Sequence, residues 1–199
     1  MHLFKRSLKK ILRSSEKAAG NAEKIRIMFE DEARFGRISD PRHCWALKGT
    51  RPVVPRQFVR EYTHAYAAVS PHDGILDSLV LPDVNAKSMS IFLSIVSERH
   101  PDELILMFMD QAAWHKAKAL EIPANIKLLN LPPYSPELNP TEHLWEDIRE
   151  GWFPNLVFKS ITAVEDTLVE GLVSLEKDAD RVAKLTGFKW IISAIKVAT

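Results

Sequence analysis

The spacing of apolar side chains predicts several β-strands in the first half of the chain. Apolar and polar residues alternate along 24–30, which is the period-two pattern of a strand. Two further strands, 62–70 and 75–81, are joined by Pro71-His72-Asp73-Gly74, a sequence typical of a turn. Residues 40–55 are rich in turn formers and predict a hairpin with a long loop.

Strand and helix patterns alternate in the middle of the chain. The segment 85–99 predicts a helix, because its apolar residues recur at helical spacing. The run 104–109 is apolar throughout, which is typical of a strand buried on both faces. A short helix is expected at 112–120 and another strand at 126–131. This order predicts a mixed α/β sheet with helices on its faces.

The last third of the chain predicts helices after a stiff, proline-rich loop at 132–136. One helix is expected to begin at Asn139-Pro140. From Ser160 onward the pattern predicts two or three more helices, with Thr162 and Glu165 in the spacing of a capping box and Gly187 as a helix end.

The composition excludes several classes of protein. With 199 residues, 46% of them hydrophobic, the chain is long enough for one domain with a full core. The 27 basic and 26 acidic side chains give a net charge of +1, so composition alone does not indicate a stand-alone nucleic-acid binder. Cys44 is the single cysteine, which excludes an internal disulfide. A reducing cytoplasm is compatible with this cysteine content, so we expect a cytoplasmic protein, and no apolar run is long enough to span a membrane.

The first 23 residues form a basic segment with apolar residues at helical spacing. We expect residues 1–23 to be an N-terminal helix or the remnant of a linker, and residues 24–199 to be the main domain with C-terminal helices. A mitochondrial transit peptide is the less favoured alternative, because the segment is short.

Three carboxylates lie at special points of the predicted elements. Asp31 ends the first strand, Asp110 ends the apolar strand, and Glu142 lies in the first turn of the helix after the proline-rich loop. Ligands of open α/β sheets bind beyond the carboxyl ends of the strands. If the strands of Asp31 and Asp110 are neighbours, both side chains converge at that edge of the sheet.

The alternation of side chains favours Asp31 over its two acidic neighbours. Asp31 shares its face with Ile27 and Phe29, whereas Glu30 and Glu32 face the other way. An inward carboxylate needs a partner, and we expect the same for Asp110.

Each carboxylate also has a structural interpretation. Asp31 can pair with Arg34 or Arg37, and Asp110 can cap the helix expected at 112–120. Glu142 stands three positions after Asn139, which is the geometry of a capping box. The set as a whole is harder to explain in this way, because clustered carboxylates repel one another unless a cation joins them. Magnesium and manganese prefer such oxygen ligands and catalyse phosphoryl transfer when bound in pairs.

Three segments resemble motifs of the mariner superfamily of transposases, especially its bacterial insertion-sequence branch. Phe29-Glu30-Asp31-Glu32-Ala33-Arg34-Phe35-Gly36 resembles the first-aspartate motif, and Phe108-Met109-Asp110-Gln111-Ala112 the second. The segment from Leu131 to Trp145, LPPYSPELNPTEHLW, is similar to the third motif and is the most specific of them. Gln111 departs from the family, which usually has asparagine there.

The resemblance covers roughly residues 24–192 and implies a ribonuclease-H-like mixed five-stranded sheet flanked by helices. It implies cut-and-paste transposition of DNA into TA-type targets by two-metal phosphoryl transfer. Asp31, Asp110 and Glu142 would be catalytic residues and ligands of two Mg²⁺ or Mn²⁺ ions. The implied partners are transposon ends, target DNA and a second copy of the chain in a homodimer.

Basic residues beside the first motif are candidate contacts to the DNA backbone. They are Arg34, Arg37, Lys48 and Arg51, with His115 near the second motif. A solvated loop is the alternative for this stretch.

Relatives in the family carry an N-terminal helix-turn-helix region that recognises transposon ends, and residues 1–23 leave no room for it. We expect an isolated domain, the downstream frame of a split gene, or a decayed remnant.

Two other functions are open alternatives. A catalytically silent transposase-derived remnant would act at most as a DNA-binding or dimerisation module. A glycoside hydrolase would use two carboxylates, which leaves Asp31 without a task.

Overall fold

The computed structural model describes residues 24–111 and 119–195. Its centre is a five-stranded sheet in the order β3-β2-β1-β4-β5. The strands are β1 (Lys24–Ile38), β2 (Phe58–Ser70), β3 (Ile75–Leu81), β4 (Glu103–Met109) and β5 (Ile126–Asn130). The expected segment 1–23, most of the expected helix 112–120, and His115 lie outside the described residues.

The sheet is mixed, as the sequence predicts. β2 runs antiparallel to both β1 and β3, whereas β4 runs parallel to both β1 and β5. The strands that carry Asp31 and Asp110 are therefore hydrogen-bonded parallel neighbours.

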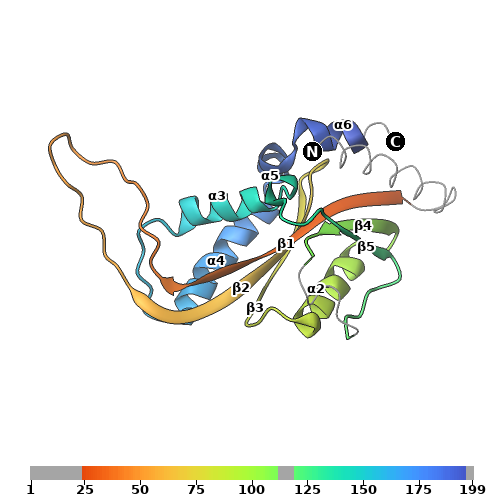
Figure 1. The fold of residues 1–199 in the computed structure, drawn as a ribbon, viewed down its shortest axis with the longest axis horizontal. Coiled ribbons are helices and arrows are strands. Elements are labelled where there is room, and N and C mark those ends of the chain that lie inside the picture. Colours follow the sequence, from red (N-terminus) through yellow and green to blue (C-terminus); the bar gives the residue numbers. More distant parts are fainter. Residues whose placement is uncertain (1–23, 112–118, 196–199) are drawn as a thin grey trace.

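Helices cover both faces of the sheet (Figure 1). One face packs against α2 (Ala86–Arg99), and the opposite face packs against the C-terminal helices. These are α3 (Glu142–Trp152), α4 (Ile161–Glu176), α5 (Ala179–Thr186) and α6 (Lys189–Ile195), preceded by the short 3-10 helix η3 (Pro136–Leu138). Side-chain alternation along β1 divides the core accordingly, with Phe29 on the α3–α4 side and Met28 on the α2 side.

The first strand is longer than its apolar pattern predicts. The expectation that Asp31 ends this strand is wrong, because β1 continues to Ile38. Its pairing with β4 stops at Phe29, but its pairing with β2 extends to Ile38, so the two strands continue as a ribbon. Asp31 thus lies in the middle of β1, although it stands at the edge where β4 ends.

The long connection between β1 and β2 extends far from the body of the domain (Figure 1, orange). It occupies residues 39–57 and confirms the expected hairpin with a long loop. No helix among the described residues is both long enough and apolar enough to cross a bilayer.

Two predicted helix starts are wrong. α3 begins at Glu142 rather than at Asn139-Pro140, and no side chain caps it. α4 is capped by Ser160, whose hydroxyl oxygen accepts from the Ala163 amide, rather than by a box of Thr162 and Glu165. Gly187 follows α5 as expected, and its amide donates to the carbonyl of Ala183.

Candidate active site

The three carboxylates line one cavity. Its volume is about 410 Å³, and it opens where β1, the end of β4, the proline-rich loop and the start of α3 meet. Its walls are Asp31, Asp110, Gln111, Leu131, Pro132, Pro133, Tyr134, Ser135, Pro136, Asn139 and Glu142. The structure therefore brings together the three residues that the sequence singled out from segments far apart in the chain.

Asp31 is the most enclosed of the three. Its side chain shares the sheet face of Phe29 and Ala33, as its parity predicts, and accepts a hydrogen bond of 2.8 Å from Trp145 Nε1. Burial raises the pKa of Asp31 to about 8, and the negative charge of Glu142 contributes to that rise. The alternative of a pair with Arg34 or Arg37 is wrong: Arg34 lies over the Tyr62 ring, and Arg37 binds Glu61.

Asp110 and Glu142 are exposed on the walls of the cavity. Asp110 follows the last residue of β4, so the expectation of an inward, enclosed side chain is wrong for this residue. Glu142 is the first residue of α3, at the positive end of the helix dipole. Beside Asp110, the Gln111 amide donates to the carbonyl of Leu131, which joins the ends of β4 and β5.

Asn139 and Thr141 attach the start of α3 to β1. The Thr141 hydroxyl donates to the Phe29 carbonyl at 2.9 Å, and Asn139 Nδ2 donates to the Glu30 carbonyl at 2.8 Å. Both side chains are buried, and the two carbonyls lie where the pairing of β1 with β4 ends. These bonds hold Glu142 beside Asp31, because Thr141 precedes Glu142 directly and Glu30 precedes Asp31.

Sequence reasoning missed this role, because it assigned Asn139 to a helix cap. The Asn139 side chain does accept from the Thr141 amide, so it stabilises a turn as well as binding β1. The signal in the sequence is the pair of hydrogen-bonding residues on either side of Pro140, directly before the helix.

Glu30 is fully buried on the opposite face of β1, beneath α2. Burial raises the pKa of Glu30 well above its usual value, with Glu32, Asp31 and Asp110 adding to the rise. The prediction that Glu30 faces away from Asp31 is confirmed, but α2 covers that second face.

The donor set fits a hard divalent cation. Carboxylate oxygens are the ligands that Mg²⁺ and Mn²⁺ prefer, and the raised pKa of Asp31 reflects its burial and, after that, the negative charge of Glu142. Within the described residues, no three histidine, cysteine or carboxylate side chains already stand in the arrangement of a metal site. Asp110 and Glu142 are exposed and thus able to adjust toward an ion.

The candidate DNA contacts occupy the hairpin formed by β1 and β2. Arg34 and Arg37 belong to β1, whereas Lys48 and Arg51 are exposed on the long connection. Arg37 is held by Glu61 and by the Phe158 carbonyl. Arg34 is exposed and remains accessible to a ligand.

Comparisons with known proteins show the family of the chain. Residues 26–165 match a family model described as DDE superfamily endonuclease. An uncharacterized protein of Sinorhizobium fredii, y4pE/y4sA, is 37% identical over 99 residues, which are 49% of this chain and 73% of that protein.

Solved structures of Mos1 share the fold. The mariner Mos1 paired end complex with Mg superposes with a TM-score of 0.62 at 19% identity, over 98% of this chain and 61% of the Mos1 chain. The Mos1 strand transfer complex gives a TM-score of 0.59 at 18% identity, with coverage of 98% and 61%. The chain thus spans about three fifths of the Mos1 protein.

Proposed function

Because the chain belongs to the DDE superfamily endonucleases, we propose that it is the catalytic domain of a DNA transposase. Its reaction would be cleavage of DNA strands and their transfer to target DNA. The observation that carries this proposal is the cavity shared by Asp31, Asp110 and Glu142. Membership of this family does not support the alternative of a glycoside hydrolase. The presence of all three carboxylates argues against the alternative of a catalytically silent remnant.

Asp31, Asp110 and Glu142 would hold two Mg²⁺ or Mn²⁺ ions. Such ions, when bound, lower the pKa of an attacking water or 3′-hydroxyl and stabilise the leaving oxygen of an in-line phosphoryl transfer. The chain's own residues position the donors. Trp145 fixes the orientation of Asp31, while Asn139 and Thr141 hold the start of α3 against β1. The proline-rich loop forms one wall of the cavity.

A plasmid-nicking assay tests the proposal. The parent should nick supercoiled DNA with Mg²⁺ or Mn²⁺ and not in chelator. Asp31→Asn, Asp110→Asn and Glu142→Gln should each lower the rate by about 100-fold or more. Asp102→Asn is the matched control, because Asp102 is exposed next to the opposite end of β4. Nicking that survives in chelator or in Asp110→Asn would contradict the assignment.

The DNA partner follows from this chemistry. With a net charge of +1, the chain should bind DNA weakly, without sequence preference, and less tightly as salt rises. Recognition of transposon ends would then require a separate DNA-recognition region. Tight sequence-specific binding by this chain at physiological salt would contradict that division of tasks.

We also propose a homodimer. Trp45, Leu47 and Val53 on the long connection are 101%, 81% and 95% exposed, and exposed apolar side chains gathered on one segment indicate a protein partner. A second copy is the occupant that a paired reaction at two DNA ends requires. Trp45→Ser should shift the mass measured by sedimentation toward the monomer, and an unchanged dimer would exclude this loop from the interface.

A further inference from the structure

Arg149 is a half-buried cation without a salt bridge to any described residue. It lies near the end of α3, with its guanidinium carbon 5.0 Å from the centroid of the Phe35 ring. Burial lowers the pKa of Arg149 and the positive charge of Arg42 lowers it further, while the negative charge of Glu142 opposes both. Half-buried charges normally have an anionic partner in direct contact, so this position can accept a ligand that carries negative charge.

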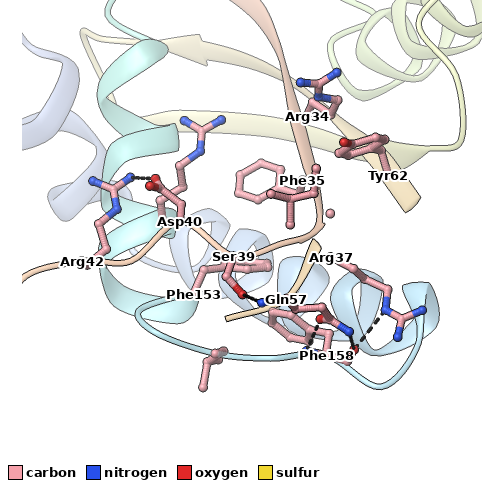
Figure 2. Close-up of a pocket in the computed structure, with 14 residues that line it drawn as sticks. Arg34, Phe35, Arg37, Ser39, Asp40, Arg42, Gln57, Tyr62, Phe153 and Phe158 are labelled. Carbon is pink, nitrogen blue, oxygen red and sulfur yellow. Dashed lines mark hydrogen bonds and ion pairs between the residues drawn. The ribbon is translucent and has the colours of Figure 1, made fainter. Parts of the chain in front are cut away.

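Arg149 stands where two cavities meet. One has a volume of about 280 Å³ and is lined by Arg42, Glu142, His143, Glu146 and Arg149. The other, of about 230 Å³, lies between β1, β2 and the segment after α3 (Figure 2). Arg42 and Arg149 line both, and Glu142 belongs to the first of them and to the carboxylate cavity. The three cavities therefore lie next to one another, with Glu142 and Arg149 on the walls between them.

The second cavity suits a planar group. Its walls include four aromatic rings, those of Phe35, Tyr62, Phe153 and Phe158. Figure 2 shows Phe35 between Arg34 with Tyr62 on one side and Arg42 with Asp40 on the other. Gly36 contributes to this shape, because a Cβ there would collide with the Tyr62 ring and the Glu61 backbone. Aromatic walls of this kind bind nucleobases by stacking, without regard to sequence.

The charges of this cavity favour an anion. Four arginines line it, against a single carboxylate, Asp40. Asp40 is 76% exposed and pairs with Arg42 at 3.1 Å, so it can leave that guanidinium when a phosphate arrives. Arginine matches phosphate oxygens with two parallel hydrogen bonds.

The spacing along α3 matches a short piece of DNA. Glu142 and Arg149 are seven residues apart on one helix, which is about 10 Å of helix axis. One DNA strand covers that length with about three stacked nucleotides.

We propose that this cavity, the arginine–aromatic pocket, binds an unpaired nucleotide of the DNA strand that reacts at the carboxylates. Its phosphate lies between Arg42 and Arg149, and its base lies among the aromatic rings. This inference rests on the proposed function, since it assigns part of the substrate site. It implies that the domain prefers DNA whose end is single-stranded over several nucleotides.

Fluorescence anisotropy in chelator tests the pocket apart from catalysis. Three labelled probes are compared. They are a blunt duplex, the same duplex with a three-nucleotide 3′ overhang, and the overhang duplex with abasic nucleotides in the overhang. The overhang should bind at least about fivefold more tightly than the blunt or base-free probe. Arg149→Gln should weaken overhang binding about tenfold and leave the blunt duplex almost unchanged. Asp40→Asn should strengthen overhang binding about two- to fivefold, because it removes the competing carboxylate.

Arg181→Gln is the matched control. Arg181 is also a partly exposed arginine that contacts α3, through Asp147, but it lines none of these three cavities. Its variant should bind all three probes as the parent does. Equal weakening of every probe by Arg149→Gln, or no gain from Asp40→Asn, would overturn the pocket. The proposed function would still stand if Asp110→Asn lost metal-dependent nicking in the same preparations.

Discussion

Trp145 Nε1 donates a hydrogen bond of 2.8 Å to Asp31 Oδ2, although the two residues are far apart in the sequence. The indole is almost completely buried between β1 and α3, so its ring fixes the distance between the strand and the helix. The same bond stabilises the ionised form of a carboxylate whose pKa burial raises. Trp145 thus connects the packing of the core to the protonation of the site.

Trp145→Phe should keep most of the packing and remove this hydrogen bond. We expect a loss of about 1–3 kcal/mol in unfolding free energy, and a further rise in the pKa of Asp31. Because Asp31 must be ionised to hold a metal ion, the rise should move the acidic limb of the rate–pH profile, where nicking increases with pH, to higher pH, which a simple packing defect would not do. Rate–pH profiles of parent and variant measure it, and superimposable profiles would exclude an electrostatic role for Trp145.

The stability of the metal-free protein should depend on Asp31 between about pH 4 and pH 8. The pKa of Asp31 is about 8 in the fold and about 3.9 in an unfolded chain. Because the folded pKa is the higher one, its contribution is fully present below about pH 4 and is lost as pH rises through 8. The loss amounts to at most about 1.4 kcal/mol per pH unit.

Asp31→Asn should flatten that part of the profile, since asparagine does not ionise and still accepts from Trp145. Urea unfolding in chelator at pH 5, 6, 7 and 8 measures the difference between parent and variant. Glu30 also has a raised pKa and acts in the same direction, so some dependence should remain. Parallel curves for the two proteins would show that Asp31 does not titrate in this range.

Adding manganese should reverse the order of stability of the parent and the Asp110→Asn variant. In chelator the variant should be at least as stable as the parent, because one of the clustered charges is gone. With free metal near 100 times its dissociation constant, binding should add about 2.7 kcal/mol to the parent, a melting shift of roughly 5–10 °C. The variant should gain much less. Equal shifts in thermal melts of both proteins would remove Asp110 from the proposed ligands.

Thr141→Val should detach the start of α3 from β1 at nearly constant side-chain shape. The lost bond to the Phe29 carbonyl should cost about 1–3 kcal/mol, because that carbonyl remains buried without its donor. Nicking should fall more than binding, since Glu142 then loses its position relative to Asp31. Thr162→Val is the control for replacing a threonine by valine, because Thr162 is exposed in the first turn of α4. A normal rate in Thr141→Val would show that Glu142 needs no such anchor.

Much of this architecture follows from local patterns in the sequence. The apolar runs predict the five strands, and the motifs around Asp31, Asp110 and Glu142 resemble the mariner superfamily. The family model over residues 26–165 shows a DDE superfamily endonuclease, and the Mos1 structures share the fold that the resemblance implies. The carboxylates converge because β1 and β4 are parallel neighbours, which the alternation of strands and helices already favours.

What the sequence does not predict depends on contacts between distant segments. β1 passes beyond its apolar pattern because β2 continues to pair with it. Asn139 and Thr141 donate to carbonyls of β1 that lie where the pairing of β1 with β4 ends. No local rule in the sequence identifies such acceptors. Glu30 is buried on the sheet face that packs against α2, and the position of that helix is set by tertiary packing.

The extra length of β1 also determines which parts of the site can move. Asp31 lies within a continuous hydrogen-bonded ladder with β2, whereas Asp110 follows a strand end and Glu142 begins a helix. The amide of Asp31 should therefore exchange its hydrogen slowly, and those around Asp110 and Glu142 faster. Any change in the spacing of the three carboxylates during a reaction must come from the chain around Asp110 and Glu142, because displacement of Asp31 would break the ladder between β1 and β2.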